Sequence, residues 1–166
     1  MKSLYLVLPV LIVATFINCQ SGGNEKCKYG APTAIFSQNL PTVVRHSFEA
    51  KGQEANEKVL FDNGISLEIN QSGCNAVKQQ FIFTLPTFPQ GEPNWIFIGA
   101  GLLKKFGELG DNFMPFVLWG DAIEKKMNEM KIGEPTELES GHYVTINKTI
   151  FPEKSILEVE LSEGKE

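Results

Sequence analysis

The sequence predicts an α+β domain, with a mostly antiparallel sheet of about six strands and two helices packed on one face. Between residues 43 and 86, apolar side chains alternate with polar ones in short runs separated by turns. The spacing changes to three and four residues between 94 and 130, which is typical of helices, and alternation returns after 142. Because strands joined by short loops run antiparallel, the order of four strands, two helices and two strands predicts this architecture.

The clearest local pattern is KVLFDNGISLEINQ, residues 58–71. Apolar residues alternate with polar ones on both sides of Asn63-Gly64, and this dipeptide supplies the positive φ angles that a tight hairpin turn needs. We therefore expect a hairpin centred on this dipeptide.

Weaker patterns flank this hairpin. VVRHSFEA, residues 43–50, predicts a half-buried strand, and the polar run KGQEANEK, residues 51–58, predicts a loop after it. QQFIFTLP, residues 79–86, predicts a fourth strand that is stopped by its proline. HYVTINKTIF (142–151) and SILEVELS (155–162) predict a last hairpin.

Two helices are expected between these groups of strands. The first starts at Asn94, although Gly99 and Gly101 weaken it by about 1 kcal/mol each relative to alanine. The second is capped by Asp111 or Asn112, with proline in its first turn, and stops at a glycine. The expected buried stripes are Trp95, Ile98, Leu102, Phe106 and Leu109 in the first helix, and Phe116, Trp119, Ile123, Met127 and Met130 in the second, between Pro115 and Gly133.

The first residues, MKSLYLVLPVLIVATFIN, have the pattern of a signal peptide. One lysine precedes an apolar run from Leu4 to Ile17. As a helix this run of about fourteen residues spans roughly 21 Å, which is too short to cross a hydrocarbon core of about 30 Å. We expect residues 1–18 to be a signal peptide.

The residues that follow, FINC and then QSGGNE, carry a resemblance to a known class. An apolar run that ends at a cysteine, here Cys19, resembles the precursor of a bacterial lipoprotein, with Phe16 and Asn18 standing where leucine and a small residue are usual. The resemblance implies that Cys19 carries lipid and anchors the chain to a membrane of the cell envelope. Residues 19–42 would then be the lipidated cysteine, a tether and an irregular approach segment; a plain secreted protein is the alternative.

Residues 43–166 are expected to form a single domain. The whole chain has 166 residues and a formal net charge of −5. Arg45 is the one arginine in it. A mildly acidic chain that is almost without arginine is not expected to bind nucleic acid, which needs clustered positive charge.

The three cysteines are an odd set. If Cys19 carries lipid, Cys27 and Cys74 remain as a pair, and export from the cytoplasm permits a disulfide between them. Such a bond closes a loop of about 47 residues, for which chain entropy gives roughly 4 kcal/mol of stability. Two buried free thiols are the alternative. Neither cysteine has the partners at fixed spacing that a metal site needs.

Catalytic and cofactor motifs are weak. Gly99-x-Gly101 lacks the third glycine of a dinucleotide fingerprint, because residue 104 is lysine. His46 and His142 stand outside any metal-ligand spacing, and Asp111 and Asp121 are better explained as helix-start residues. We therefore expect no catalytic residue, no metal and no cofactor.

One loop favours binding. LPTFPQGEPNWIF, residues 85–97, places Phe88 and Trp95 around three prolines, and an aromatic residue in such a loop can anchor a partner. In the alternative, both rings fold back onto the sheet. The expected function is a lipid-anchored, non-catalytic envelope protein with a protein partner. The rival hypotheses are an envelope carbohydrate hydrolase using Asp111, Asp121 or His142, and a small-molecule or lipid carrier with a pocket between helices and sheet.

Overall fold

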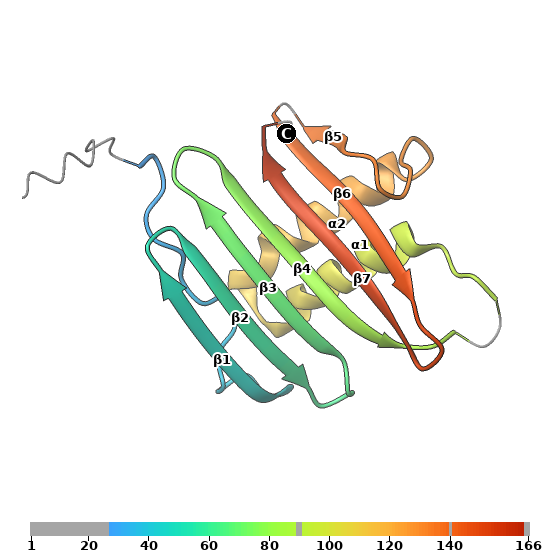
Figure 1. The fold of residues 1–166 in the computed structure, drawn as a ribbon, viewed down its shortest axis with the longest axis horizontal. Coiled ribbons are helices and arrows are strands. Elements are labelled where there is room, and N and C mark those ends of the chain that lie inside the picture. Colours follow the sequence, from blue (N-terminus) through green and yellow to red (C-terminus); the bar gives the residue numbers. More distant parts are fainter. Residues whose placement is uncertain (1–26, 89–90, 140, 165–166) are drawn as a thin grey trace, which may run out of the picture.

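The structure is a computed structural model that describes residues 27–88, 91–139 and 141–164. Seven strands and two α-helices follow one another along these residues (Figure 1). Their bounds are β1 (Val43–Lys51), β2 (Glu54–Phe61), β3 (Ser66–Gly73), β4 (Val77–Pro86), α1 (Trp95–Phe106), α2 (Met114–Lys126), β5 (Thr136–Glu139), β6 (His142–Ile150) and β7 (Lys154–Glu163).

All seven strands form one antiparallel sheet in the order β1-β2-β3-β4-β7-β6-β5. The α+β class is therefore confirmed, and the sheet has seven strands rather than about six. The missed strand is β5, which has four residues and pairs with β6. Its sequence, TELE, is too short and too acidic to stand out from the charged loop before it.

The expected loop at residues 51–58 is wrong. Only Gly52 and Gln53 form the turn, where Gly52 has a φ of 63°, and β2 already begins at Glu54. Within β2, residues 55, 57, 59 and 61 point inward and are buried. Charge hid this alternation, because Glu57 occupies an inward position that is normally apolar.

Glu57 is fully buried, and both of its carboxylate oxygens accept hydrogen bonds. Its two carboxylate oxygens accept hydrogen bonds from the backbone N–H groups of Ile35, at 2.9 Å, and Phe36, at 2.8 Å. His46 Nε2 of the neighbouring strand β1 lies 2.8 Å from Oε1 of the same carboxylate. Such partners are what makes burial of a carboxylate tolerable in a low-dielectric interior.

The segment before β1, residues 27–42, contains no helix or strand, yet it belongs to the core. The side chain of Phe36 is only 3% exposed. Its ring centroid lies 5.6 Å from that of Phe61, 5.0 Å from Phe106 and 5.3 Å from Phe113. The carboxylate of Glu57 therefore fixes a segment that fills one end of the inner sheet face.

Helix α1 starts where expected, because the side chain of Asn94 accepts a hydrogen bond from the N–H of Phe97. Its buried face is turned relative to the expected stripe and consists of Trp95, Gly99, Ala100, Leu103 and Phe106. A Cβ on Gly99 would lie 3.1 Å from a methyl carbon of Val159 in β7. The glycine thus allows the helix backbone to approach the sheet closely.

Helix α2 departs from the expectation at both ends. No side chain caps it, and Asp111 begins a short 3₁₀ turn before it instead. Asp121 lies in the middle of the helix, where one carboxylate oxygen is 2.9 Å from Lys104 Nζ of α1. The helix ends at Lys126, and Gly133 bonds through its N–H to the carbonyl of Ile146 beyond the helix.

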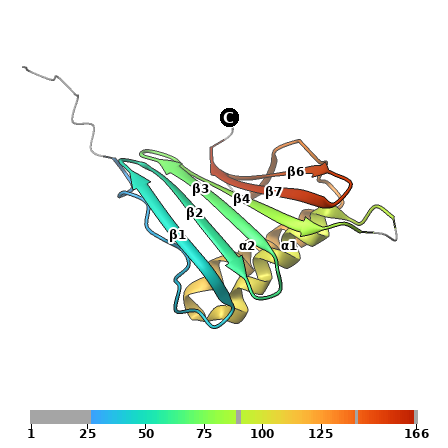
Figure 2. The ribbon, with the colours of Figure 1, turned by 60° about the horizontal axis from the view of Figure 1, so that its bottom comes forward.

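The two helices lie on one face of the sheet, as Figures 1 and 2 show from two directions. Phe106 of α1 is central to the contact, with its ring centroid 6.2 Å from Phe81 and 6.1 Å from Phe83 of β4. Phe116 of α2 packs edge-on against both Phe81 and Phe106. One aromatic cluster therefore joins both helices to the middle of the sheet.

Replacement of Glu57 by alanine is expected to lower the free energy of unfolding by about 3 kcal/mol or more, because the buried donors of Ile35, Phe36 and His46 lose their acceptor. Urea unfolding measures this change. Glu54→Ala is the matched control, since Glu54 is an exposed glutamate on the same strand and should change stability by less than about 0.5 kcal/mol. Equal effects of the two variants would contradict this role of Glu57.

Two glycines give a second test of the helix packing. A Cβ on Gly120 of α2 would lie 2.7 Å from the carbonyl oxygen of Ala100, whereas a Cβ on Gly101 meets nothing within 4 Å. Gly120→Ala should therefore destabilise the protein by about 1–3 kcal/mol, and Gly101→Ala should stabilise it by roughly 0.5–1 kcal/mol. Thermal unfolding of both variants checks the opposite signs. The same sign for both would contradict the close approach of the helices.

Candidate functional site

The loop between β4 and α1 carries the two aromatic residues that the sequence singles out. Trp95 is 4% exposed and Phe88 is 38% exposed. Their rings meet edge to face, with centroids 5.3 Å apart. Because Trp95 is buried, its ring is not available for direct contact with a partner. Its indole ring belongs to the core, as the alternative interpretation holds, and Phe88 packs on its outer side.

This loop is held to the sheet by Lys148 of β6. The ammonium group of Lys148 forms an ion pair with Glu92 in the loop and lies 5.9 Å from the ring centroid of Trp95. A cation over an indole face adds an attraction of about 0.5–2 kcal/mol. The indole Nε1 of Trp95 has no hydrogen-bond acceptor among the described residues.

Large exposed apolar side chains occur in the segments that lie at this end of the molecule. Pro86, the last residue of β4, pairs with Lys154, the first residue of β7, so the loop after β4 lies beside the β6–β7 turn. The apolar tip, as we name this group, consists of Phe88 (38% exposed), Phe97 (55%), Ile150 (56%) and Phe151 (43%). The other large exposed apolar side chains in the described residues are dispersed over β1, α2 and the loop after α2.

The sequence pattern does not single out two members of the apolar tip. Ile150 and Phe151 precede the turn PEKS, and alternation places them only in the last hairpin. Hairpin turns are normally polar. Two apolar residues directly beside the turn are therefore the sequence feature that indicates exposed apolar side chains here.

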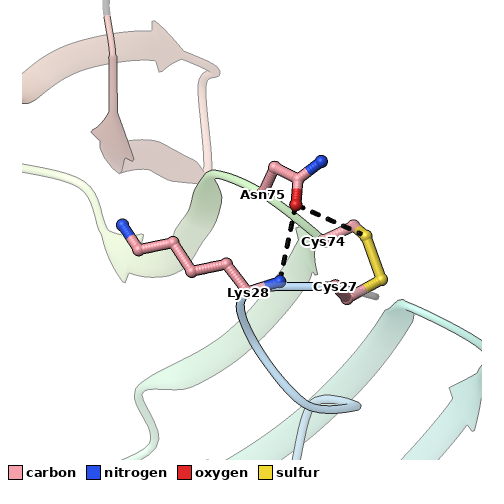
Figure 3. Close-up of a disulfide and its surroundings, with 4 residues drawn as sticks. All are labelled: Cys27, Lys28, Cys74 and Asn75. Atoms are coloured by element: carbon pink, nitrogen blue, oxygen red, sulfur yellow. Dashed lines mark hydrogen bonds between the residues drawn. A yellow bond between two sulfur atoms is a disulfide. The ribbon is translucent and has the colours of Figure 1, made fainter. Parts of the chain in front are cut away.

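The opposite end of the sheet holds the disulfide between Cys27 and Cys74 (Figure 3). This confirms the predicted pairing and excludes free thiols at these two positions. The bond ties the start of segment 27–42 to the β3–β4 turn. The backbone supports the same link, since the N–H of Tyr29 donates to the carbonyl of Cys74 at 3.0 Å, and that of Lys28 to the side chain of Asn75 at 3.4 Å.

A charged cluster lies beside the disulfide. Glu163 of β7 accepts hydrogen bonds from Lys28 Nζ at 2.6 Å and from the Tyr29 hydroxyl at 2.7 Å. The bond to Glu163 raises the pKa of Lys28 to about 12. The same bond, with help from Tyr29, lowers the pKa of Glu163 below its ordinary value. Lys28 and Glu163 are therefore both charged at neutral pH and hold the approach segment to the last strand.

The disulfide and the apolar tip lie at opposite ends of β4. Cys74 comes just before β4 begins at Val77, and Phe88 comes just after β4 ends at Pro86. Ten residues of strand at about 3.3 Å each separate the two ends by roughly 30 Å. Segment 27–42 therefore enters the domain at the end far from the apolar tip.

The outer face of the sheet, which the helices do not cover, is polar. Side chains form a ladder of hydrogen bonds across β2, β3, β4 and β7: Asn56 donates to Glu68 and Asn70, Asn70 donates to Gln80, and Gln80 donates to Glu158. The distances lie between 2.7 and 2.9 Å. These groups satisfy one another, as polar residues on the open side of an antiparallel sheet commonly do.

Two open hollows lie on this outer face. One has a volume of about 460 Å³ near the β1–β2 turn, and the other about 250 Å³ over β4, β7 and β6. Lys78 lines both, and its ammonium group is 3.0 Å from Glu160. Most of the residues that line them carry a hydroxyl, amide or charged group.

The candidate hydrolytic residues are not assembled. His142 lines a hollow of about 190 Å³ with Tyr29 and Glu163, and its ring centroid is 5.6 Å from that of Trp119. Neither Asp111 nor Asp121 lines that hollow. His46 is bound to buried Glu57. Within the described ranges, no group of three or more histidine, cysteine, aspartate or glutamate side chains is placed to hold a metal ion.

The interface between helices and sheet leaves little space for a ligand. The hollow beside Phe106 and Phe83, at the end of α1, has a volume of about 120 Å³. Pockets for small molecules usually measure about 300–1,000 Å³.

The chain matches no family model, no curated protein and no solved structure. None of the helices in the described part of the chain is long and apolar enough to cross a membrane. The expected signal peptide and the lipid site Cys19 lie outside the described residues. A disulfide is typical of chains that leave the reducing cytoplasm.

Loss of the disulfide in a Cys27→Ser/Cys74→Ser variant is expected to lower the free energy of unfolding by roughly 4 kcal/mol. Without the bond, the 47-residue loop regains its conformational freedom in the unfolded chain. Urea unfolding measures this change, and the intact mass of the wild type should rise by two hydrogens on reduction. Ser47→Ala, an exposed substitution of similar size on β1, is the control. A variant as stable as the wild type would show that other contacts already fix the approach segment.

Proposed function

We propose that this protein is a lipid-anchored, non-catalytic binding protein of the bacterial cell envelope that contacts a protein partner through the apolar tip. The observation that carries this proposal is the exposure of Phe88, Phe97, Ile150 and Phe151 at one end of the domain. Water-exposed apolar side chains that gather in one region commonly mark interaction sites, whereas scattered ones need no explanation.

The loop of the apolar tip is also pre-organised. Lys148 holds Glu92 and lies over the ring of Trp95, and Trp95 in turn supports Phe88. A binding loop that is already ordered loses less conformational entropy when a partner binds. Aromatic side chains in such positions contribute a large share of the binding energy at protein interfaces.

The position of the apolar tip suits an anchored protein. Lipid on Cys19 would hold the chain at its N-terminal side, and segment 27–42 joins the domain at the disulfide end. The apolar tip lies at the other end of β4, so it would point away from the anchor. The disulfide agrees with an oxidising compartment outside the cytoplasm.

The two rival functions have less support. A carrier needs a pocket larger than the 120 Å³ hollow at the helix–sheet interface. In a hydrolase, Asp121 would have to be free to act on a substrate, but it pairs with Lys104 on the neighbouring helix.

The test is capture of partners by the anchored protein in detergent, from envelope extract and from extracellular fluid. Phe88→Ala and Phe151→Ala should each weaken capture of a specific protein by at least tenfold, which corresponds to about 1.4 kcal/mol, without changing the fold. Leu118→Ala, an exposed apolar residue on α2 at 65% exposure, is the matched control and should leave capture unchanged.

Trp95→Ala should behave differently from the variants of the apolar tip. Because its ring is buried, we expect a loss of about 3–5 kcal/mol of stability in urea unfolding. Capture that is equally strong in wild type and in both variants of the apolar tip would contradict this assignment of the binding surface. Turnover of wall glycans by the wild type would contradict the non-catalytic function.

A further inference from the structure

Strand β1 forms one edge of the sheet and is open on its outer side (Figure 1). In the described ranges, the backbone of residues 45–51 pairs only with β2. Gln38 donates weakly to the carbonyls of Val43 and Val44 at the start of the strand, at 3.4 and 3.3 Å. A row of free backbone donors and acceptors therefore faces outward along most of the strand.

This edge offers a longer stretch of backbone for strand addition than the opposite edge does. Strand β1 has nine residues without proline, most of them exposed, and Val44 is 57% exposed. The opposite edge strand, β5, has only four residues, of which two are glutamates. Proteins commonly protect edges with short strands, prolines, charges and bulges. Strand β5 is protected by its shortness, whereas β1 is long and without proline, and its charged side chains and the register shift between Val43 and Arg45 restrict which strand can add to it.

Addition of a second copy is limited by symmetry. Two copies of β1 pair antiparallel around a two-fold axis perpendicular to the sheet, which keeps both helical layers on the same side. Side chains that face each other across the two strands must then lie on the same side of the joined sheet. Because successive residues alternate between the two sides, the axis must pass through a residue that faces its own counterpart in the second copy. The candidates in the middle of the strand are residues 45 to 49.

The charges on the outer side of β1 distinguish these registers. With Ser47 at the axis, Arg45 faces the partner's Glu49, and this pair occurs twice. With residue 45 or 49 at the axis, like charges face their own counterparts, and with residue 48 at the axis Arg45 faces the partner's Lys51. With residue 46 at the axis, neither Arg45 nor Glu49 faces an opposite charge. Opposite charges across a strand pair stabilise it, and like charges destabilise it.

The register centred on Ser47 also keeps the middle of the contact regular. Ser47 is the midpoint of Val43–Lys51, and residues 45–49 of the two copies face one another without interruption. The register shift between Val43 and Arg45 affects only the ends of this contact. On the inner side, His46 faces the partner's Phe48. The charge pattern thus decides the register.

We propose that two copies of this chain pair through β1, antiparallel and centred on Ser47, to form one continuous sheet. The contact is one strand wide, so the dimer depends on concentration. Anchoring both copies in one membrane would raise their effective concentration. The proposal is independent of the apolar tip, which lies away from the midpoint of β1.

The test is a Ser47→Cys variant of the full chain in detergent, oxidised mildly and resolved without reductant. Because the two copies of residue 47 face each other, their Cα atoms lie about 4.5–5.5 Å apart, which a disulfide can span. We expect a covalent dimer in this variant. Wild type and Lys131→Cys, a distant and exposed position, report any dimer that forms through other cysteines.

Charge reversal tests the register. Arg45→Glu in the Ser47→Cys chain should reduce the covalent dimer at least tenfold, and adding Glu49→Arg should restore it, because the opposite pairs form again. Lys131→Glu, with the same change of charge elsewhere, should have no effect. Near-ultraviolet circular dichroism verifies that each variant is folded. Absence of a dimer in Ser47→Cys, or a dimer that ignores both reversals, would overturn the proposal.

Discussion

The pairing of β4 with β7 is the contact on which the rest of the architecture depends. Nine register pairs, from Lys78–Ser162 to Pro86–Lys154, join a hairpin series at the start of the chain to another at its end. The helices lie in the connection between β4 and β5, so the last three strands join the sheet after the chain has passed through both helices. The same pairing brings the loop after β4 beside the β6–β7 turn and thereby creates the apolar tip.

A second constraint comes from one buried carboxylate. Glu57 stands where the alternation of β2 calls for an apolar side chain, and its three hydrogen-bond partners come from segment 27–42 and β1. An apolar side chain at this position would bury more hydrophobic surface. The carboxylate instead fixes the position of segment 27–42, which has no regular secondary structure. Phe36 then enters the aromatic cluster, and the disulfide closes the same segment at its other end.

The two proposed contact surfaces differ in physical character. The apolar tip offers side chains on ordered loops, which suits recognition of a different protein. The edge of β1 offers backbone groups and a charge pattern that is complementary to itself, which suits a second copy of the same chain. The outer sheet face between them is polar and largely satisfied by its own hydrogen bonds, so it has less to gain from a partner.

Local patterns in the sequence determined much of the secondary structure. The hairpin at Asn63-Gly64, the start of α1 at Asn94 and the last hairpin follow from turn chemistry, capping and alternation, which act within a few residues. The Cys27–Cys74 pair followed from counting cysteines. Of the candidate site, the loop with Phe88 could be identified in this way, because prolines around aromatic residues are visible in the sequence.

Only the tertiary structure decided the remaining features, because they depend on residues far apart in the chain. The rotation of α1 about its own axis, which buries Gly99 more fully than Ile98, results from close packing of the helix on β7. The inward position of Glu57 depends on its hydrogen-bond partners at residues 35, 36 and 46. Burial of Trp95 and exposure of Ile150 and Phe151 depend on the β4–β7 pairing. Local pattern thus determined most of the strands and helices, though not β5 or the first half of β2, and long-range contacts decided which of their side chains face water.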